Sequence, residues 1–220
     1  MTVRCDKCTL FACYNPQELG KTSKLDFCPM NVCKAALDEA REEYKNPDVR
    51  KIALASSWVE ATGYMKWTRV EETIEFARKM KFRKLGIACC IGLKKEGKIL
   101  ADVLKANGFE VVFTFCKAGA IVKEELGLRR EEKIHPEKFE AMCNPIGLAK
   151  ILNREETELN VVVGLCVGHD SLFMKYSKAL VTVLVAKDRP LCHNPVGALN
   201  TADGYYESKL YEEHREVTAK

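Results

Sequence analysis

The sequence predicts an α/β fold: a parallel, doubly wound (Rossmann-like) sheet with helices on both faces, preceded by a cysteine-rich N-terminal segment. Three observations support this prediction. Strand-length apolar runs recur along the chain, segments with helical periodicity separate them, and five of the eleven cysteines fall within the first 33 residues. With 220 residues, the chain is long enough to bury a hydrophobic core.

The strands are predicted from short, continuous apolar runs, which occupy residues 85–90, 109–115, 161–166 and 180–186. Continuous rather than alternating hydrophobicity indicates that both faces of the sheet are covered. Because helical segments alternate with these runs, we expect parallel strands joined by right-handed crossovers.

The helices are predicted from apolar residues that recur with helical spacing. Ahead of the first strand we expect helices at 31–44, at 48–64 and after Thr68, which has capping-box spacing with Glu71. The later helices are expected at 93–107, 121–126, 144–153 and 171–178.

A domain division is also predicted. Residues 1–46 form the cysteine-rich segment and its first helix, and residues 47–220 form the α/β domain with a site at its sheet edge. The N-terminal segment contains too few large apolar residues to make a core of its own. A bound metal is therefore expected to fix it.

The charge balance and the hydropathy of the chain indicate which partners and which compartment to expect. The chain has 35 Lys and Arg against 31 Asp and Glu, and no basic run is interleaved with aromatic residues, so nucleic acid is not an expected partner. The start lacks a secretory pattern and the apolar runs are too short to span a bilayer, so we expect a cytoplasmic protein with no membrane partner. In a reducing cytoplasm, eleven cysteines indicate core thiols, catalytic thiols or metal ligands rather than disulfides.

The N-terminal cysteines have the spacing C-x2-C-x4-C-x14-C-x4-C, in which the first pair can bring two sulfurs to one metal. Two ligand sets are open. An iron-sulfur cluster would use Cys5, Cys8, Cys13 and Cys28, in which Cys28-Pro29 is similar to the Cys-Pro ending of ferredoxin ligand runs although the inner spacings differ from those of ferredoxin. A structural zinc ion would use Cys5, Cys8, Cys28 and Cys33.

A second group of cysteines is expected at the C-terminal edge of the sheet. Cys90, Cys116 and Cys166 lie at or just after the ends of three predicted strands, and Cys143 precedes a helix. Ligands of open α/β sheets bind at this edge, at a topological switch point. These four thiols are therefore predicted to share one metal centre, although buried cysteine also occurs simply as a small core residue.

Neighbouring residues on a strand point to opposite faces, which favours Cys90 over Cys89 as a ligand. Neither Cys89 nor Cys192 is assigned to a site.

Polar residues near the same edge complete the predicted site. His169, Asp170 and His193 are the candidates for catalysis, as groups that move protons or tune the metal. The candidates for binding the cofactor, or an anionic substrate, are Lys117, Ser171 and Arg189, together with Lys187. Helix capping by Asp170 or Ser171 and surface ion pairing by the cations are the ordinary alternatives.

Several of these motifs together carry a family resemblance. They are Cys5-x2-Cys8-x4-Cys13, Cys116-Lys117, Met142-Cys143-Asn144-Pro145, the segment 164–171 and Lys187-Asp188-Arg189 followed by His193-Asn194-Pro195. With them the chain resembles, over nearly its whole length, a prokaryotic domain-of-unknown-function family of uncharacterised, cysteine-rich metal-binding proteins. The resemblance implies metal binding and leaves the reaction open.

The leading hypothesis is an iron-sulfur protein with one or two clusters of the 4Fe-4S type and a redox or sulfur-handling role. The N-terminal cluster would exchange electrons with a partner protein, and the sheet-edge cluster would meet a small-molecule substrate. Such an enzyme would be an iron-sulfur-dependent oxidoreductase or a sulfur-handling enzyme. The alternatives are a non-catalytic zinc-binding or metal-sensing and storage module, and a thiol enzyme with Cys166 as nucleophile beside His169. No sequence pattern indicates the substrate or the oligomeric state.

Overall fold

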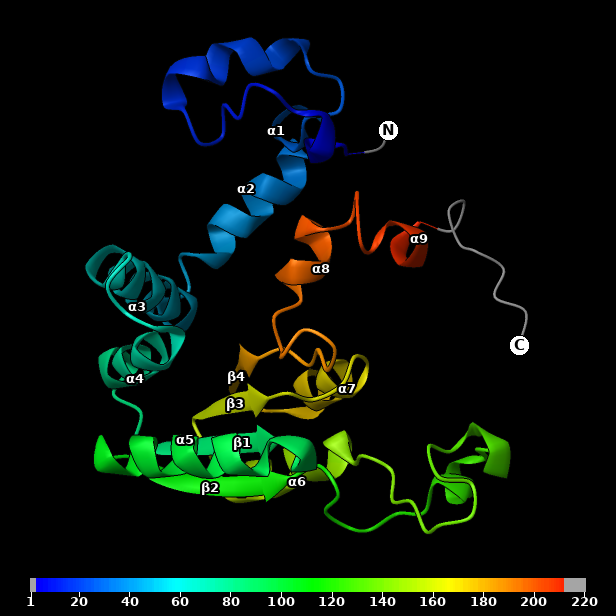
Figure 1. Ribbon diagram of the computed structural model, residues 1–220. Helices are drawn as coiled ribbons and strands as arrows, with labels where there is room; N and C mark the ends of the chain where they lie inside the picture. Colours follow the sequence, from blue (N-terminus) through cyan, green and yellow to red (C-terminus); the bar gives the residue numbers. More distant parts are fainter. Residues whose placement is uncertain (1–2, 212–220) are drawn as a thin grey trace. The chain divides into compact units, whose positions relative to one another are not determined.

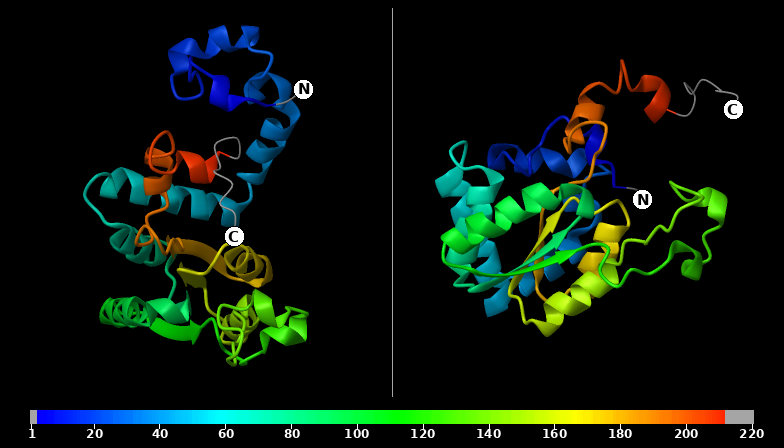
Figure 2. Two further views of the ribbon diagram at one scale, coloured as in Figure 1. Left: turned by 45° about the vertical axis from the view of Figure 1, so that its right-hand side comes forward. Right: turned by 60° about the horizontal axis from the view of Figure 1, so that its bottom comes forward.

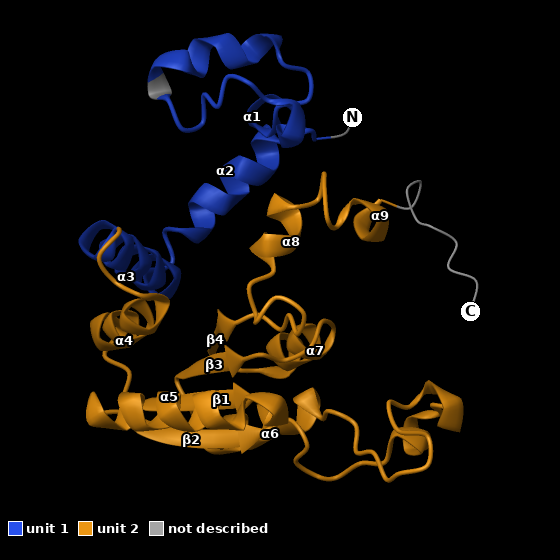
Figure 3. Ribbon diagram, viewed as in Figure 1, with its two compact units in different colours: residues 1–64 blue, residues 65–220 orange. Residues whose placement is uncertain are grey.

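The computed structural model describes residues 3–211. The chain divides into two compact units, residues 1–64 and 65–220, which are coloured separately in Figure 3. The domain division that the sequence predicts after residue 46 stays a prediction.

The first unit is helical. After two 3-10 segments, η1 (Cys5–Lys7) and η2 (Pro16–Lys24), it contains α1 (Pro29–Val32), α2 (Lys34–Glu43) and α3 (Pro47–Gly63). The helix predicted at 31–44 is thus present in two pieces, because the backbone leaves the helical region at Cys33. The helix predicted at 48–64 is confirmed as α3, where the side chain of Asn46 accepts a hydrogen bond from the amide of Asp48.

The second unit is built on a four-stranded sheet whose neighbouring strands are all parallel, as predicted. Its strands are β1 (Lys84–Cys89), β2 (Glu110–Phe115), β3 (Leu159–Val163) and β4 (Leu180–Val185), in the order β2-β1-β3-β4. The winding reverses between β1 and β3, which places the topological switch point between the two central strands.

Helices cover both faces of this sheet, which confirms the doubly wound prediction (Figure 2). The first face packs against α4 (Arg69–Met80) and α5 (Lys94–Ala106), and the second against α6 (Pro145–Arg154) and α7 (His169–Tyr176). The predicted capping box at the start of α4 is present, with Thr68 and Glu71 bonded reciprocally. Side chains alternate along the first strand, so Cys89 joins the first face while Cys90, just past the strand, joins the second.

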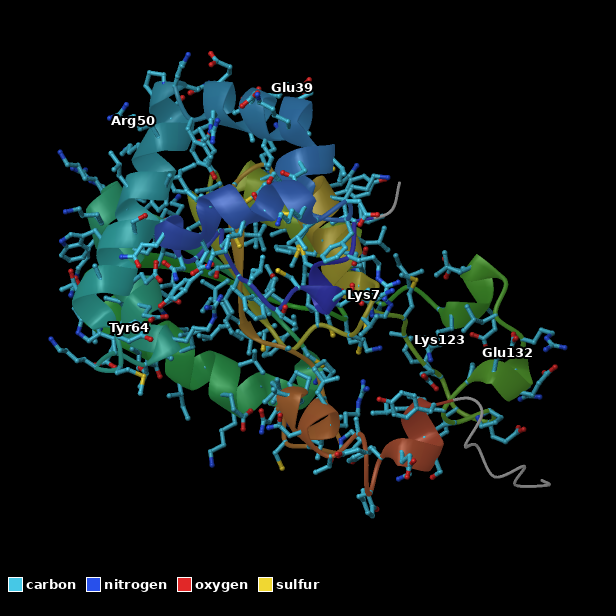
Figure 4. The ribbon with its side chains drawn as sticks, turned by 90° about the horizontal axis from the view of Figure 1, so that it is seen from above. Lys7, Glu39, Arg50, Tyr64, Lys123 and Glu132 are labelled. Atoms are coloured by element: carbon cyan, nitrogen blue, oxygen red, sulfur yellow. The ribbon has the colours of Figure 1, made fainter. Side chains whose placement is uncertain are left out.

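The connection from β2 to α6 is a long excursion, residues 117–142, which projects from the end of the sheet (Figure 1). The helix predicted at 121–126 is only a 3-10 turn, η4 (Lys123–Leu126), because Gly127 takes a left-handed φ of 89° and ends it. A second turn, η5 (Arg130–Glu132), follows in the outer part of the excursion. Figure 4 labels Lys123 near its base and Glu132 farther out.

The base of the excursion is closed by an isolated antiparallel bridge between Val122 and Ala141 and by an ion pair between Lys123 and Glu140. Three short helical segments complete the second unit: η3 (Ile91–Leu93) after β1, and α8 (Val196–Asn200) and α9 (Glu207–Leu210) after β4. Within residues 3–211, no helix is long and apolar enough to cross a membrane.

Candidate functional site

Three cysteine thiols meet at the C-terminal edge of the sheet. Cys90 directly follows β1, Cys116 directly follows β2, and Cys143 precedes Asn144, the N-cap residue of α6. The Sγ atoms of Cys116 and Cys143 are 3.7 Å apart, and Cys90 also hydrogen-bonds to Cys116. Cys116 is 1% exposed and Cys90 7%, whereas Cys143 is half-buried.

Backbone hydrogen bonds hold these segments beside one another. The amide of Cys116 donates to the carbonyl of Cys89 at 2.8 Å, which extends the pairing of β1 and β2 by one residue. The carbonyl of Cys116 then accepts from the amide of Asn144 at 2.7 Å. The amide of Ile91 donates to the sulfur of Cys116 at 3.4 Å. The sheet itself therefore sets the positions of the thiols.

Hydrogen bonding distributes charge unevenly over these thiols. The contact with Cys116 lowers the pKa of Cys90 to about 4 and the pKa of Cys143 to about 5, although burial opposes both changes. The contacts with Cys143 and Cys90, together with burial, raise the pKa of Cys116. This environment favours the thiolate form of Cys90 and Cys143 and the neutral form of Cys116. Thiolates are the form in which cysteine binds soft metals and acts as a nucleophile.

Cationic side chains balance this negative charge. Lys187 hydrogen-bonds to Cys90, and Nη2 of Arg189 lies 3.2 Å from the sulfur of Cys166. That contact raises the pKa of Arg189 further above its ordinary value. The charge of Lys117 favours the thiolate before α6, while its Nζ donates to the carbonyl of residue 141.

Cys166 and His169 enter the site from the loop between β3 and α7. The carbonyl of Cys166 accepts from the amides of His169 and Asp170, at 2.9 and 3.1 Å, and so forms the first turn of α7. The Nδ1 atom of His169 is buried without a hydrogen-bond partner in the described chain. Because buried polar atoms are nearly always paired, this nitrogen indicates a missing partner, such as a bound metal, a cluster sulfide or water.

The other predicted polar residues have local roles. A carboxylate oxygen of Asp170 accepts from the amide of Ser171 at 2.8 Å. His193 accepts from the amide of Asp188 through Nδ1 at 3.0 Å, and its own amide donates to the carbonyl of that residue at 2.7 Å. His193 therefore shapes the loop that carries Lys187 and Arg189.

The two cysteines left unassigned from the sequence lie apart from the three-thiol group. Cys89 is fully buried on the opposite face, where its sulfur lies 3.3 Å from the carbonyl of Cys90 and 3.4 Å from that of Leu93. Burial raises the pKa of Cys89 to about 12, so it remains a thiol. Cys192 is exposed.

The N-terminal cysteines border a hollow inside the first unit. Cys5, Cys8, Cys13 and Cys28 line a space of about 100 Å³ that also touches apolar residues such as Phe11 and Leu25. This volume is several times the ~30 Å³ share of one water molecule in the liquid. The four cysteines are the set that the sequence associates with an iron-sulfur cluster.

The spacing of these side chains differs from that of a single-ion site. Within residues 3–211, no three His, Cys, Asp or Glu side chains are arranged to hold one metal ion. Around a tetrathiolate zinc ion, with Zn–S bonds of ~2.3 Å, the sulfurs lie only about 4 Å apart.

Sequence reasoning missed the amide of Ile91 as a donor to a site sulfur. Its position just beyond the end of the first strand is the signal that points to it, since backbone amides at such edges face the ligand.

The fold and the site define a class: an α/β protein whose parallel sheet carries thiols and cations at its C-terminal edge. Within that class, the chain belongs to the family described as "Protein of unknown function (DUF1847)", whose profile matches residues 28–184. It is similar to "Uncharacterized protein MJ0455" of Methanocaldococcus jannaschii, with 46% identity over 210 residues that cover 96% of this chain and 99% of that protein. The expected membership of a prokaryotic domain-of-unknown-function family is thereby confirmed. The family match includes all the sheet-edge cysteines and begins after Cys13.

Proposed function

We propose that the protein binds an iron-sulfur cluster at the sheet edge through Cys90, Cys116 and Cys143, and uses it in a redox or sulfur-handling reaction. The observation that carries this proposal is the 3.7 Å contact between the sulfurs of Cys116 and Cys143, with Cys90 packed in the same buried cluster. These residues come from three elements far apart in sequence. Their meeting at the switch-point edge favours a binding site over scattered core thiols.

The residues around these thiols suit such a cluster. The Ile91 amide is a hydrogen-bond donor to sulfur, a contact of the kind that tunes cluster potentials. Lys187 supplies positive charge beside thiolate ligands. The unpaired Nδ1 of His169 would find a partner in the cluster or in its fourth ligand position. A bound cluster would supply one-electron transfer or a Lewis-acidic iron.

Cys166 is the proposed fourth ligand. Its sulfur already has a partner in Arg189, at 3.2 Å, so ligation would release that guanidinium to bind an anionic substrate.

We propose a second cluster in the N-terminal hollow, where it would exchange electrons with a partner protein. The support is the lining of one apolar hollow by Cys5, Cys8, Cys13 and Cys28. Zinc, which would need the set with Cys33, is the alternative occupant. The eleven cysteines all lie within the described chain and are free thiols, which suits a reducing compartment, so the cytoplasm is the proposed location.

Metal analysis of the full-length protein, purified without oxygen, tests this function. We expect brown protein with iron and acid-labile sulfide, and a paramagnetic signal after reduction. The double variant Cys116→Ser and Cys166→Ser should lose the iron of one site, while exposed Cys192→Ser, the matched control, keeps all of it. Colourless protein with stoichiometric zinc and no sulfide would refute the proposal.

A further inference from the structure

We infer that Cys116 and Cys143 form a thiol–disulfide exchange site, which reduces small-molecule disulfides when no metal occupies the sheet edge. The inference concerns two sulfurs of the proposed metal centre and does not require that centre to exist. Three observations support the inference: the distance between the two sulfurs, their unequal exposure, and the backbone hydrogen bond that holds the two segments side by side.

The two sulfurs are close enough to bond after a small movement. They lie 3.7 Å apart and must approach to the ~2.0 Å of a disulfide, a change of about 1.7 Å. The hydrogen bond from the Asn144 amide to the Cys116 carbonyl, at 2.7 Å, keeps the two backbones adjacent during that movement. Side-chain rotation is then the main change required.

The excursion between the two cysteines is already closed at its base. Val122 pairs with Ala141, and Lys123 forms an ion pair with Glu140. A bond between Cys116 and Cys143 would therefore tie chain segments that already run side by side. Large backbone movement, the usual obstacle to a new disulfide, is not needed here.

The two thiols also differ in access. Cys143 is half-buried and directly precedes Asn144, the N-cap residue of α6, outside the sheet. Cys116 is 1% exposed. The accessible Cys143 is therefore the attacking thiol and Cys116 the resolving one. Cys90 also adjoins Cys116 but is only 7% exposed, which makes it the poorer nucleophile for an external disulfide.

The reaction balances without a further reagent. The Cys143 thiolate attacks one sulfur of a disulfide RSSR, forms a mixed disulfide and expels one RS⁻. The Cys116 thiol then gives its proton to the expelled RS⁻, attacks the Cys143 sulfur and expels the second RS⁻, which takes a proton from water. The two cysteines are oxidised to one disulfide, and one RSSR is reduced to two thiols. An external dithiol would return the protein to its reduced form.

Oxidised glutathione is the probe for the test. The full-length protein is reduced, freed of metal with a chelator, checked for native circular dichroism and mixed with glutathione disulfide under nitrogen. We expect peptide mass mapping to find a Cys116–Cys143 crosslink, formed with the release of two equivalents of glutathione thiol beyond those that exposed cysteines such as Cys5, Cys13 and Cys192 release. With Cys116→Ser, this site should release only one equivalent, and mapping should find glutathione trapped on Cys143. Cys143→Ser should react at least tenfold more slowly at this site.

Exposed Cys192→Ser is the matched control and should still form the crosslink. Should Cys116→Ser misfold, Cys116→Ala replaces it, because a buried thiol packs as a small apolar group. A Cys90–Cys116 crosslink, or glutathione on exposed cysteines with Cys116 and Cys143 still reduced, would overturn the inference. Metal content of anaerobically purified protein is measured separately, so failure of the exchange activity is distinguishable from failure of the proposed cluster.

Discussion

The N-terminal hollow and the sheet edge both gather cysteines, but different kinds of structure hold them. Between residues 3 and 33, the buried residues that the structure describes are Ala12, Thr22 and Cys28. The thiols of Cys90 and Cys116, by contrast, belong to a core cluster with β-strands and two helices around it. We therefore expect the N-terminal segment, which lacks a core, to depend on a bound ligand for its order, and the sheet edge to keep its structure without one.

The largest expected effect is loss of order in the N-terminal segment when its ligands are removed. With Cys5→Ser and Cys8→Ser together, metal of the first site should be lost and residues 1–33 should exchange their amide hydrogens freely, because little apolar burial remains to order them. Hydrogen exchange and metal analysis measure both effects. The described part of the second unit, residues 65–211, should keep its protection. If the variant keeps its metal and an ordered N-terminus, the N-terminal segment does not depend on these ligands and does not differ from the sheet edge in this respect.

The second expected effect is loss of metal at the sheet edge without loss of fold. With Cys116→Ser and Cys166→Ser, the second site should bind no metal, while the thermal transition persists. The buried hydroxyl at residue 116 should cost about 1–3 kcal/mol of unfolding free energy. Calorimetry and iron analysis check these outcomes. Collapse of the sheet after metal loss would show that this edge depends on its ligand as the N-terminus does.

These expectations also show what the sequence could predict. The ends of the predicted strands were enough to predict that Cys90, Cys116 and Cys166 lie at one edge of the sheet. Continuous apolar runs identify the strands of a parallel sheet, and the ends of those strands meet at one edge. The contact between Cys116 and Cys143 was harder to predict. It depends on how a 26-residue excursion returns to the sheet, and the Lys123–Glu140 pair at its base leaves no periodic signal in the sequence.

The local role of His193 was equally hidden. A histidine before Asn-Pro is compatible with a proton carrier, and only the folded loop shows Nδ1 accepting from the Asp188 amide. In the N-terminal segment, the sequence left two ligand sets open, because spacing alone does not say which sulfurs surround a common space. The hollow adjoins the set that contains Cys13.

The third prediction sharpens the assignment within the sheet edge by comparing two adjacent cysteines. Cys90→Ala should reduce second-site metal at least tenfold, because it removes a ligand. Cys89→Ala should leave the metal unchanged and cost ~1–2 kcal/mol through the cavity left in the opposite face. Metal titration and denaturant unfolding of both variants give the comparison. If both variants lost the same amount of metal, the opposite orientation of the two side chains would not distinguish a metal ligand, Cys90, from a core thiol, Cys89.

The smallest expected effect concerns acid and the base of the excursion. The contact with Lys123, helped by the amide of His135, lowers the pKa of Glu140 to about 2, against ~4.3 for an unperturbed glutamate. Because the folded pKa is the lower one, this contribution to stability is complete above about pH 4.3 and is lost as the pH falls toward 2. Acid should therefore open residues 117–142 before it unfolds the sheet. Hydrogen exchange of this segment between pH 5 and pH 2.5 measures the opening, and Lys123→Met should remove the part of its pH dependence that Glu140 contributes, while Glu124 and Glu132, whose pKa values are also lowered, keep theirs. A wild-type excursion whose protection stays constant over that range would show that the bridge between Val122 and Ala141 closes the base without help from the ion pair.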